Sequence, residues 1–179
     1  EVKKLAVIAG HSANDYTESY KAMLKTNNYE IDVISEAIIT SISSEYDAVL
    51  IAAPTVDFLG SELDAISEFL DNDGMLGKGL LFFADATMPY LSNLYDFLEQ
   101  WGISVEEGIV YETDTSNHLP DQPTAIGIYP NGTEDKITAG MTLFITDSNV
   151  PMKPAFTNEN GIEVTTIASS GNTAIAAPA

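Results

Sequence analysis

Three apolar runs in the first half of the sequence constrain the fold most strongly, because none of them alternates with polar residues. They are LAVIA within 4–9, AVLIAA within 47–54 and LLFFA within 79–86. Strands that are apolar on both faces are typical of the interior of a parallel sheet. Segments with helical periodicity separate the runs. This alternation predicts an α/β fold with a mostly parallel sheet and helices on both of its faces.

The helices between the strands are predicted from apolar spacing and from their end signals. One is expected over 13–26, ending at Asn27. A second is expected from Ser61 as N-cap, with Asp64 three residues later and Gly74 as the stop. A third is expected over 90–101, closed by Gly102.

The sequence changes character after Gly108. Short strand-like pieces such as GIVYET, TAIGIY, MTLFIT and EVTTIAS are separated by clusters of Asn, Asp, Pro and Gly. We therefore expect a more β-rich C-terminal part that adds strands at the edge of the sheet. The length of 179 residues favours a single α/β domain over 1–179.

The charge balance excludes several classes of partner. The chain has 27 Asp and Glu, 7 Lys and no Arg, giving a formal net charge of -20. Nucleic-acid binding needs a basic surface, so it is excluded, and the lack of Arg weighs against phosphorylated ligands. The absence of cysteine excludes thiol nucleophiles, disulfides and cysteine-ligated metals. No apolar stretch is long enough to span a membrane, and we expect the chain to be part of a longer protein.

The first candidate site residues follow the first predicted strand. His11 comes directly after Gly10, at the carboxyl end of the sheet, where ligands of open α/β folds bind. Asp15, one turn into the next helix, would assist a ligand-binding or metal-binding imidazole. The alternative is a packed histidine that hydrogen-bonds loop backbone. Ser12 is interpreted as a contact residue or helix N-cap, since no G-x-S-x-G elbow accompanies it.

Two further aspartates follow the next two predicted strands. Asp57 lies in the loop after Pro54, and Asp85 lies at the end of the 79–86 run. With His11 they would form a cluster able to ligate a hard cation or bind a polar ligand. The alternative is that each caps a following turn or helix. Tyr90 and Tyr95 are candidates for an exposed partner surface. No glycine-rich phosphate loop is present, and no cofactor or resident metal is expected.

Four ordered pieces of the sequence carry a resemblance to a known family. They are LAVIAGH (5–11), YDAVLIAAPTVDFLGSELDAISEFLDNDG (46–74), LLFFADATMPYLSNLYDFLEQWGISVEEGIVYE (80–112) and KITAGMTLFITDSNVPM (136–152). In this order they resemble the extracytoplasmic domain of the GldG-like, ABC-type auxiliary transport protein family. The resemblance implies a Rossmann-like or glutamine-amidotransferase-like three-layer sandwich that lacks an amidotransferase nucleophile.

The resemblance also sets the expected function. It implies a non-catalytic, extracytoplasmic binding or interaction domain whose partner is an ABC permease or another membrane transport component, with a small polar ligand as a second possible partner. The full-length protein would be anchored in the cell membrane, and contact with the membrane would come only through segments outside this chain. Two alternatives stay open: a metal-assisted hydrolase that uses His11, Asp57 and Asp85, and a purely structural spacer domain.

Overall fold

The computed structural model describes residues 2–12, 22–131 and 137–178. The chain divides into two compact units. The first unit comprises residues 1–84 and 88–94, and the second comprises residues 85–87 and 95–179. Each unit is described by itself below. The expected single domain over 1–179 stays a prediction, because a division of contacts does not show whether either unit folds alone.

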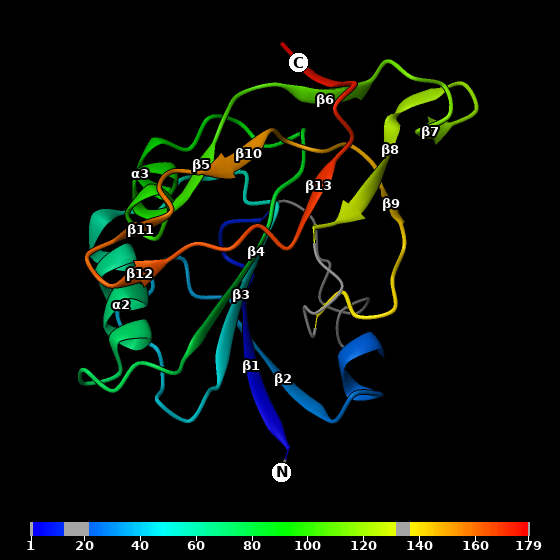
Figure 1. Ribbon diagram of the computed structural model, residues 1–179. Helices are drawn as coiled ribbons and strands as arrows, with labels where there is room; N and C mark the ends of the chain where they lie inside the picture. Colours follow the sequence, from blue (N-terminus) through cyan, green and yellow to red (C-terminus); the bar gives the residue numbers. More distant parts are fainter. Residues whose placement is uncertain (1, 13–21, 132–136, 179) are drawn as a thin grey trace. The chain divides into compact units, whose positions relative to one another are not determined.

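A four-stranded parallel sheet forms the first unit (Figure 1). Its strand order is β2-β1-β3-β4, with β1 at Lys3–Ile8, β2 at Tyr29–Ile34, β3 at Ala48–Ala52 and β4 at Gly79–Phe83. Leu50 of the central strand β3 pairs with Val7 on one side and Leu81 on the other. The apolar runs therefore became neighbouring parallel strands, as their lack of alternation predicted.

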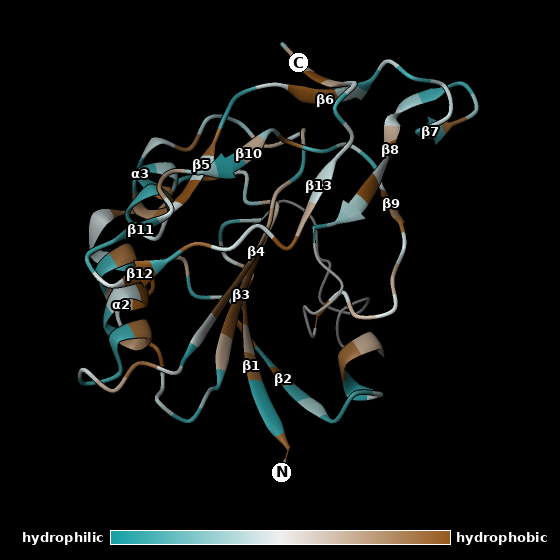
Figure 2. Cartoon of the chain, in the orientation of Figure 1, coloured by the Kyte–Doolittle hydropathy of each residue, from teal (hydrophilic) through white to brown (hydrophobic). Residues whose placement is uncertain are grey.

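Burial in the first unit follows hydropathy along β1 and β3, whereas the apolar edge strand β4 leaves Leu81 43% and Phe83 47% exposed. Figure 2 shows hydrophobic residues along β3 and β4, whereas the amino end of β1 is hydrophilic. One face of the sheet carries a buried cluster of Leu5, Val7, Leu50 and Ala52, against which Leu24 packs. Helix α2 (Gly60–Asp71) buries Leu63, Ala65, Ile66, Phe69 and Leu70 along one side. This is the i, i+3, i+4 stripe of a helix that packs on a core.

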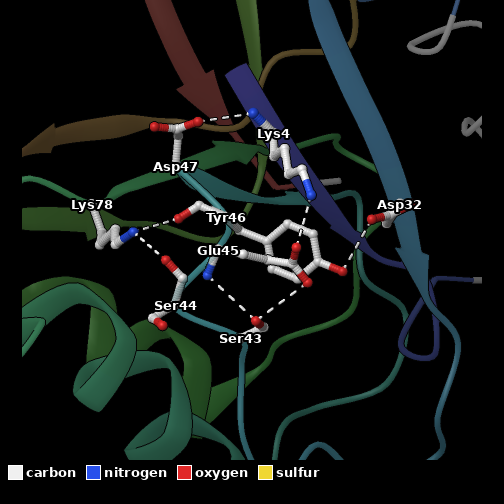
Figure 3. Close-up of polar contacts among 8 residues, drawn as sticks. All are labelled: Lys4, Asp32, Ser43, Ser44, Glu45, Tyr46, Asp47 and Lys78. Atoms are coloured by element: carbon white, nitrogen blue, oxygen red, sulfur yellow. Dashed lines mark hydrogen bonds and ion pairs between the residues drawn. The ribbon is translucent and has the colours of Figure 1, made fainter. Parts of the chain in front are cut away.

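Lys4 and Lys78 form hydrogen bonds with the loop before β3, at the amino end of the sheet (Figure 3). The Asp47 carboxylate accepts a hydrogen bond from the Lys4 backbone N–H at 2.8 Å. The Lys78 ammonium donates to the carbonyl oxygens of Ser44 and Tyr46, each at 2.7 Å. The Lys3 and Lys4 ammonium groups pair with the carboxylates of Asp47 and Glu45 in the same loop, so three of the seven lysines act here.

Short antiparallel sheets dominate the second unit. Helix α3 (Ser92–Gln100) crosses the boundary between the units: its residues up to Leu94 belong to the first unit and those from Tyr95 to the second. The pairs are β5 (Ile103–Val105) with β10 (Met152–Pro154), β6 (Ile109–Glu112) with β14 (Ala174–Ala177), and β11 (Asn158–Glu159) with β12 (Ile162–Glu163). The central strand β8 (Gln122–Pro130) pairs with β7 (His118–Leu119), β9 (Phe144–Thr146) and β13 (Ala168–Ser170).

The expectation of a Rossmann-like or glutamine-amidotransferase-like three-layer sandwich is wrong. The described residues are 35% strand and 15% helix, and only one small sheet is parallel. The physical reason lies in the connections. A parallel pair needs a crossover of a dozen or more residues, usually a helix, whereas tight turns join antiparallel strands. The turn-rich sequence after Gly108 supplies no helix among its described residues, so its strands pair antiparallel.

Candidate functional site

The His11 side chain is buried and is held on three sides. Only 4% of the residue is exposed. Its Nδ1 lies 3.1 Å from the Val56 carbonyl oxygen, and its Nε2 lies 3.0 Å from Oε1 of Glu62. The Phe58 ring stacks on the imidazole, with 3.8 Å between centroids and 10° between planes. Both ring nitrogens face acceptors inside the protein, so neither is directed at solvent.

Glu62 connects His11 to two other segments. This residue is 1% exposed. Its Oε1 accepts from the Ile39 backbone N–H at 2.9 Å, and its Oε2 accepts from the Leu59 N–H at 2.8 Å. Burial raises the pKa of this carboxyl, but the hydrogen bonds from Ile39, Leu59 and His11 outweigh burial and lower the pKa. The ionised carboxylate therefore joins the loop after β1, the backbone at Ile39 between β2 and β3, and the start of α2.

The hydrogen bonding of Glu62 was not predicted, because the N-cap of α2 was expected at Ser61 and lies at Leu59. The helix begins at Gly60 with Leu59 as N-cap, so Glu62 is the third helical residue. A glutamate at this position reaches back to the N-cap backbone N–H, as in a capping box. That spacing was the signal that could have identified it. Phe58, also missed, is fully buried against His11.

Ser12 and Asp57 both make structural hydrogen bonds. The Ser12 hydroxyl donates to the Ala52 carbonyl oxygen at 2.7 Å, which ties the loop after β1 to the end of β3. The Asp57 carboxylate accepts from the backbone N–H groups of Asn93 at 2.9 Å and Leu94 at 3.1 Å. Asp57 thus caps the first turn of α3 from a distant loop. Asp15 lies outside the described residues.

Asp85 belongs to the second unit, whereas His11 and Asp57 belong to the first, and its carboxylate makes a local turn. Its Oδ1 accepts from the Thr87 backbone N–H at 2.8 Å and from the Thr87 hydroxyl at 2.6 Å. Among the residues that the structure describes, no group of three or more His, Asp or Glu side chains is placed to hold a metal ion. Of the two tyrosines considered for a partner surface, Tyr90 is exposed and Tyr95 is buried.

Two large apolar side chains are exposed at this edge of the first unit. Val56 is 58% exposed and Leu59 is 51% exposed, and they flank the buried Phe58. The polar candidates Ser12 and Asp57 are half-buried and engaged in hydrogen bonds. The arrangement is therefore a polar network that shapes a loop, with apolar side chains presented outward.

The fold is similar to that of a solved protein domain. The structure of the mmIFT52 N-terminal domain superposes with a TM-score of 0.68 at 15% sequence identity, over 96% of this chain and 75% of that chain. At this identity the likeness shows the fold alone. No curated protein matches the sequence. Over 2–12, 22–131 and 137–178, no helix combines the length and hydropathy needed to cross a bilayer.

The family is shown by a match over nearly the whole sequence. The profile of the family described as "ABC-type uncharacterized transport system" matches residues 2–179. The chain belongs to this family of auxiliary components of ABC-type transport systems, and the resemblance found in the sequence is confirmed.

Proposed function

We propose that this chain is a non-catalytic binding or interaction domain that lies outside the cytoplasmic membrane and contacts a membrane component of its ABC-type transport system. Family membership supports the connection to transport. Placement outside the membrane, and the partner, are the proposed steps.

One observation carries the non-catalytic reading. A general base or metal ligand needs a nitrogen directed at substrate or metal, whereas both His11 nitrogens are occupied by Val56 and Glu62 in a buried position. A hydrolase that uses His11, Asp57 and Asp85 would also require Asp57 to leave the start of α3. The exposed pair Val56 and Leu59 is instead suited to protein contact, in which apolar side chains are buried.

Site-specific photo-cross-linking of the full-length protein in its native membrane tests the contact. A photoreactive residue at Val56 should cross-link to a permease or other subunit of the transport system, identified by mass spectrometry of the joined peptides. The matched control is Met75, which is 74% exposed in the turn after α2. Equal cross-linking from both positions, or none to a transport component, would reject the contact at this loop.

The location is tested separately. The chain has no cysteine, so Met75→Cys introduces one exposed thiol within it. In intact cells a membrane-impermeant maleimide should label this peptide, with a cytoplasmic protein as the negative control. Labelling that appears only after the cells are lysed would contradict extracytoplasmic placement.

A further inference from the structure

A groove of about 760 Å³ lies on the second unit and is lined by the later turns of α3 and by the β11–β12 hairpin. Figure 1 shows this hairpin beside α3. Its lining combines acidic, amide and apolar side chains. The lining residues are Asp96, Glu99, Gln100, Ala155, Phe156, Glu159, Asn160 and Ile162.

The two walls follow from regular local structure. On α3, Asp96, Glu99 and Gln100 are spaced i, i+3 and i+4, which places them on one helix face. Opposite them, Asn160 and Gly161 have φ values of 50° and 83° and form the two-residue turn of the hairpin. Glu159 and Ile162 are register partners beside this turn, and both line the groove.

The apolar floor is fixed by close packing at a glycine. Gly102 has φ +88°, and a Cβ added there would meet Val164 Cγ2 at 2.2 Å and Phe156 Cζ at 3.2 Å. Its carbonyl oxygen accepts from the Ala155 N–H at 2.9 Å. The Phe156 ring therefore packs directly on backbone, so the floor is formed before any partner arrives.

The charges around this floor are not neutralised within the described chain. No ion pair joins Asp96, Glu99 or Glu159 to a lysine among the residues that the structure describes, and Lys153 pairs with Glu106 instead. Negative charge near the carboxyl end of a helix is unfavourable because the helix dipole is negative there. Glu99 lies in the last turn of α3, so helix stability does not account for it.

We propose that this groove is the docking surface for a segment of a protein partner in which lysine or arginine side chains flank an apolar side chain. The apolar side chain would lie on Phe156 and Ile162, while the cations would face Asp96 and Glu99 on one wall and Glu159 on the other. The argument for a cationic occupant is charge complementarity: a groove with carboxylates on both walls attracts cations and repels anionic segments. The inference rests on the proposed interaction function and names the chemistry of its partner.

The test uses two synthetic fluorescent peptides and two charge-reversal variants. One peptide carries three lysines on each side of a Leu-Trp-Leu centre, and the other replaces the centre with Gly-Ser-Gly. Glu159→Lys places a cation in the groove. Glu163→Lys makes the same charge change on the same hairpin, but its side chain alternates to the opposite face from Ile162.

Fluorescence anisotropy gives the expected and the contrary results. We expect Glu159→Lys to weaken binding of the Leu-Trp-Leu peptide about tenfold and Glu163→Lys to weaken it less than about twofold. The Gly-Ser-Gly peptide should bind wild-type protein about tenfold more weakly. Equal weakening by both variants would show attraction to overall charge only, and equal binding of both peptides would show that the floor is not used; either result overturns the proposal. Thermal unfolding of both variants establishes that they are folded.

The outcome is distinguishable from failure of the proposed function. If Val56 cross-links to a transport component while Glu159→Lys leaves peptide binding unchanged, the function stands and the groove proposal fails. If the groove binds the peptide as expected while neither Val56 nor Glu159 cross-links to a transport component in the native membrane, the groove stands and the proposed function fails.

Discussion

The imidazole of His11 and the carboxylate of Glu62 form a buried pair, with 3.0 Å between Nε2 and Oε1, beneath the Phe58 ring. Three segments that are distant in sequence meet at this pair: the loop after β1, the backbone at Ile39 and the start of α2. Its position at the carboxyl end of the parallel sheet is where catalytic groups often occur, yet its contacts are those of a structural core.

Replacing His11 should therefore unfold the protein more easily. His11→Ala removes a buried hydrogen-bond partner and leaves the Glu62 carboxylate without its ring contact, at a cost of about 3 kcal/mol in free energy of unfolding. His118→Ala is the control, because His118 is partly exposed and its Nδ1 lies 2.6 Å from the carbonyl oxygen of the adjacent Leu119. Urea denaturation checks the difference. Equal effects from the two histidines would contradict the structural role.

Glu62 should make stability depend on acid pH. Its folded-state pKa lies below the ordinary value of 4.5, so the unfolded chain binds its proton more readily. The contribution is complete above the unfolded pKa and is lost as pH falls through the folded pKa. We expect the urea midpoint of wild type to fall more steeply below about pH 5 than that of Glu62→Gln, which cannot titrate. Parallel curves for the two proteins would show that other carboxylates dominate.

Asp57→Ala should destabilise α3 through the loss of its cap. The substitution leaves the N–H groups of Asn93 and Leu94 unpaired, with an expected cost of about 1 to 2 kcal/mol. Asp64→Ala on the exposed side of α2 serves as the matched loss of one aspartate. Thermal and urea unfolding give the comparison, and a loss no larger than that of Asp64→Ala would argue against capping.

Two glycine substitutions separate backbone strain from steric overlap. Gly74 and Gly102 both have positive φ, but a Cβ at Gly74 meets nothing within 4 Å, whereas one at Gly102 overlaps Val164. Gly74→Ala should cost about 1 kcal/mol. Gly102→Ala should cost at least about 2 kcal/mol more, since the floor of the groove must shift. Similar unfolding midpoints for both variants would mean that the Val164 side chain moves aside at little cost.

The sequence predicted the first unit well because its signals are local. The apolar run around Leu50 is buried and identifies a central strand, whereas the equally apolar run around Leu81 forms the edge strand β4, where Leu81 is 43% exposed. After Gly108 the strands are two to nine residues long, and pairs such as Glu112 with Ala174 join distant segments. Hydropathy does not encode which of several short strands meet. The local pattern therefore held no signal against the three-layer sandwich that the resemblance implied, which is wrong.

The candidate site was predicted by position but not by contact. The placement of His11 after a strand and Gly10 is a matter of chain order, which a sequence reveals. Its partner Glu62 is separated from it by 51 residues, and nothing in the sequence around His11 points to it. Asp57 shows the same limit: it caps a helix, but through the N–H of Asn93, which lies 36 residues further along the chain. The binding roles expected for His11, Ser12, Asp15, Asp57 and Asp85 stay predictions.

The cap that Asp57 provides also couples the motions of the loop after β3 to those of the start of α3. The amide hydrogens of Asn93 and Leu94 are held by a carboxylate from the loop after β3 rather than by their own helix. They can exchange with deuterium only when that loop releases them, so their exchange rates report opening of the 55–58 segment. A partner that binds Val56 and Leu59 would keep the loop closed and slow hydrogen exchange at Asn93 and Leu94. Exchange at the start of α3 would then report binding at a distance from the contact itself.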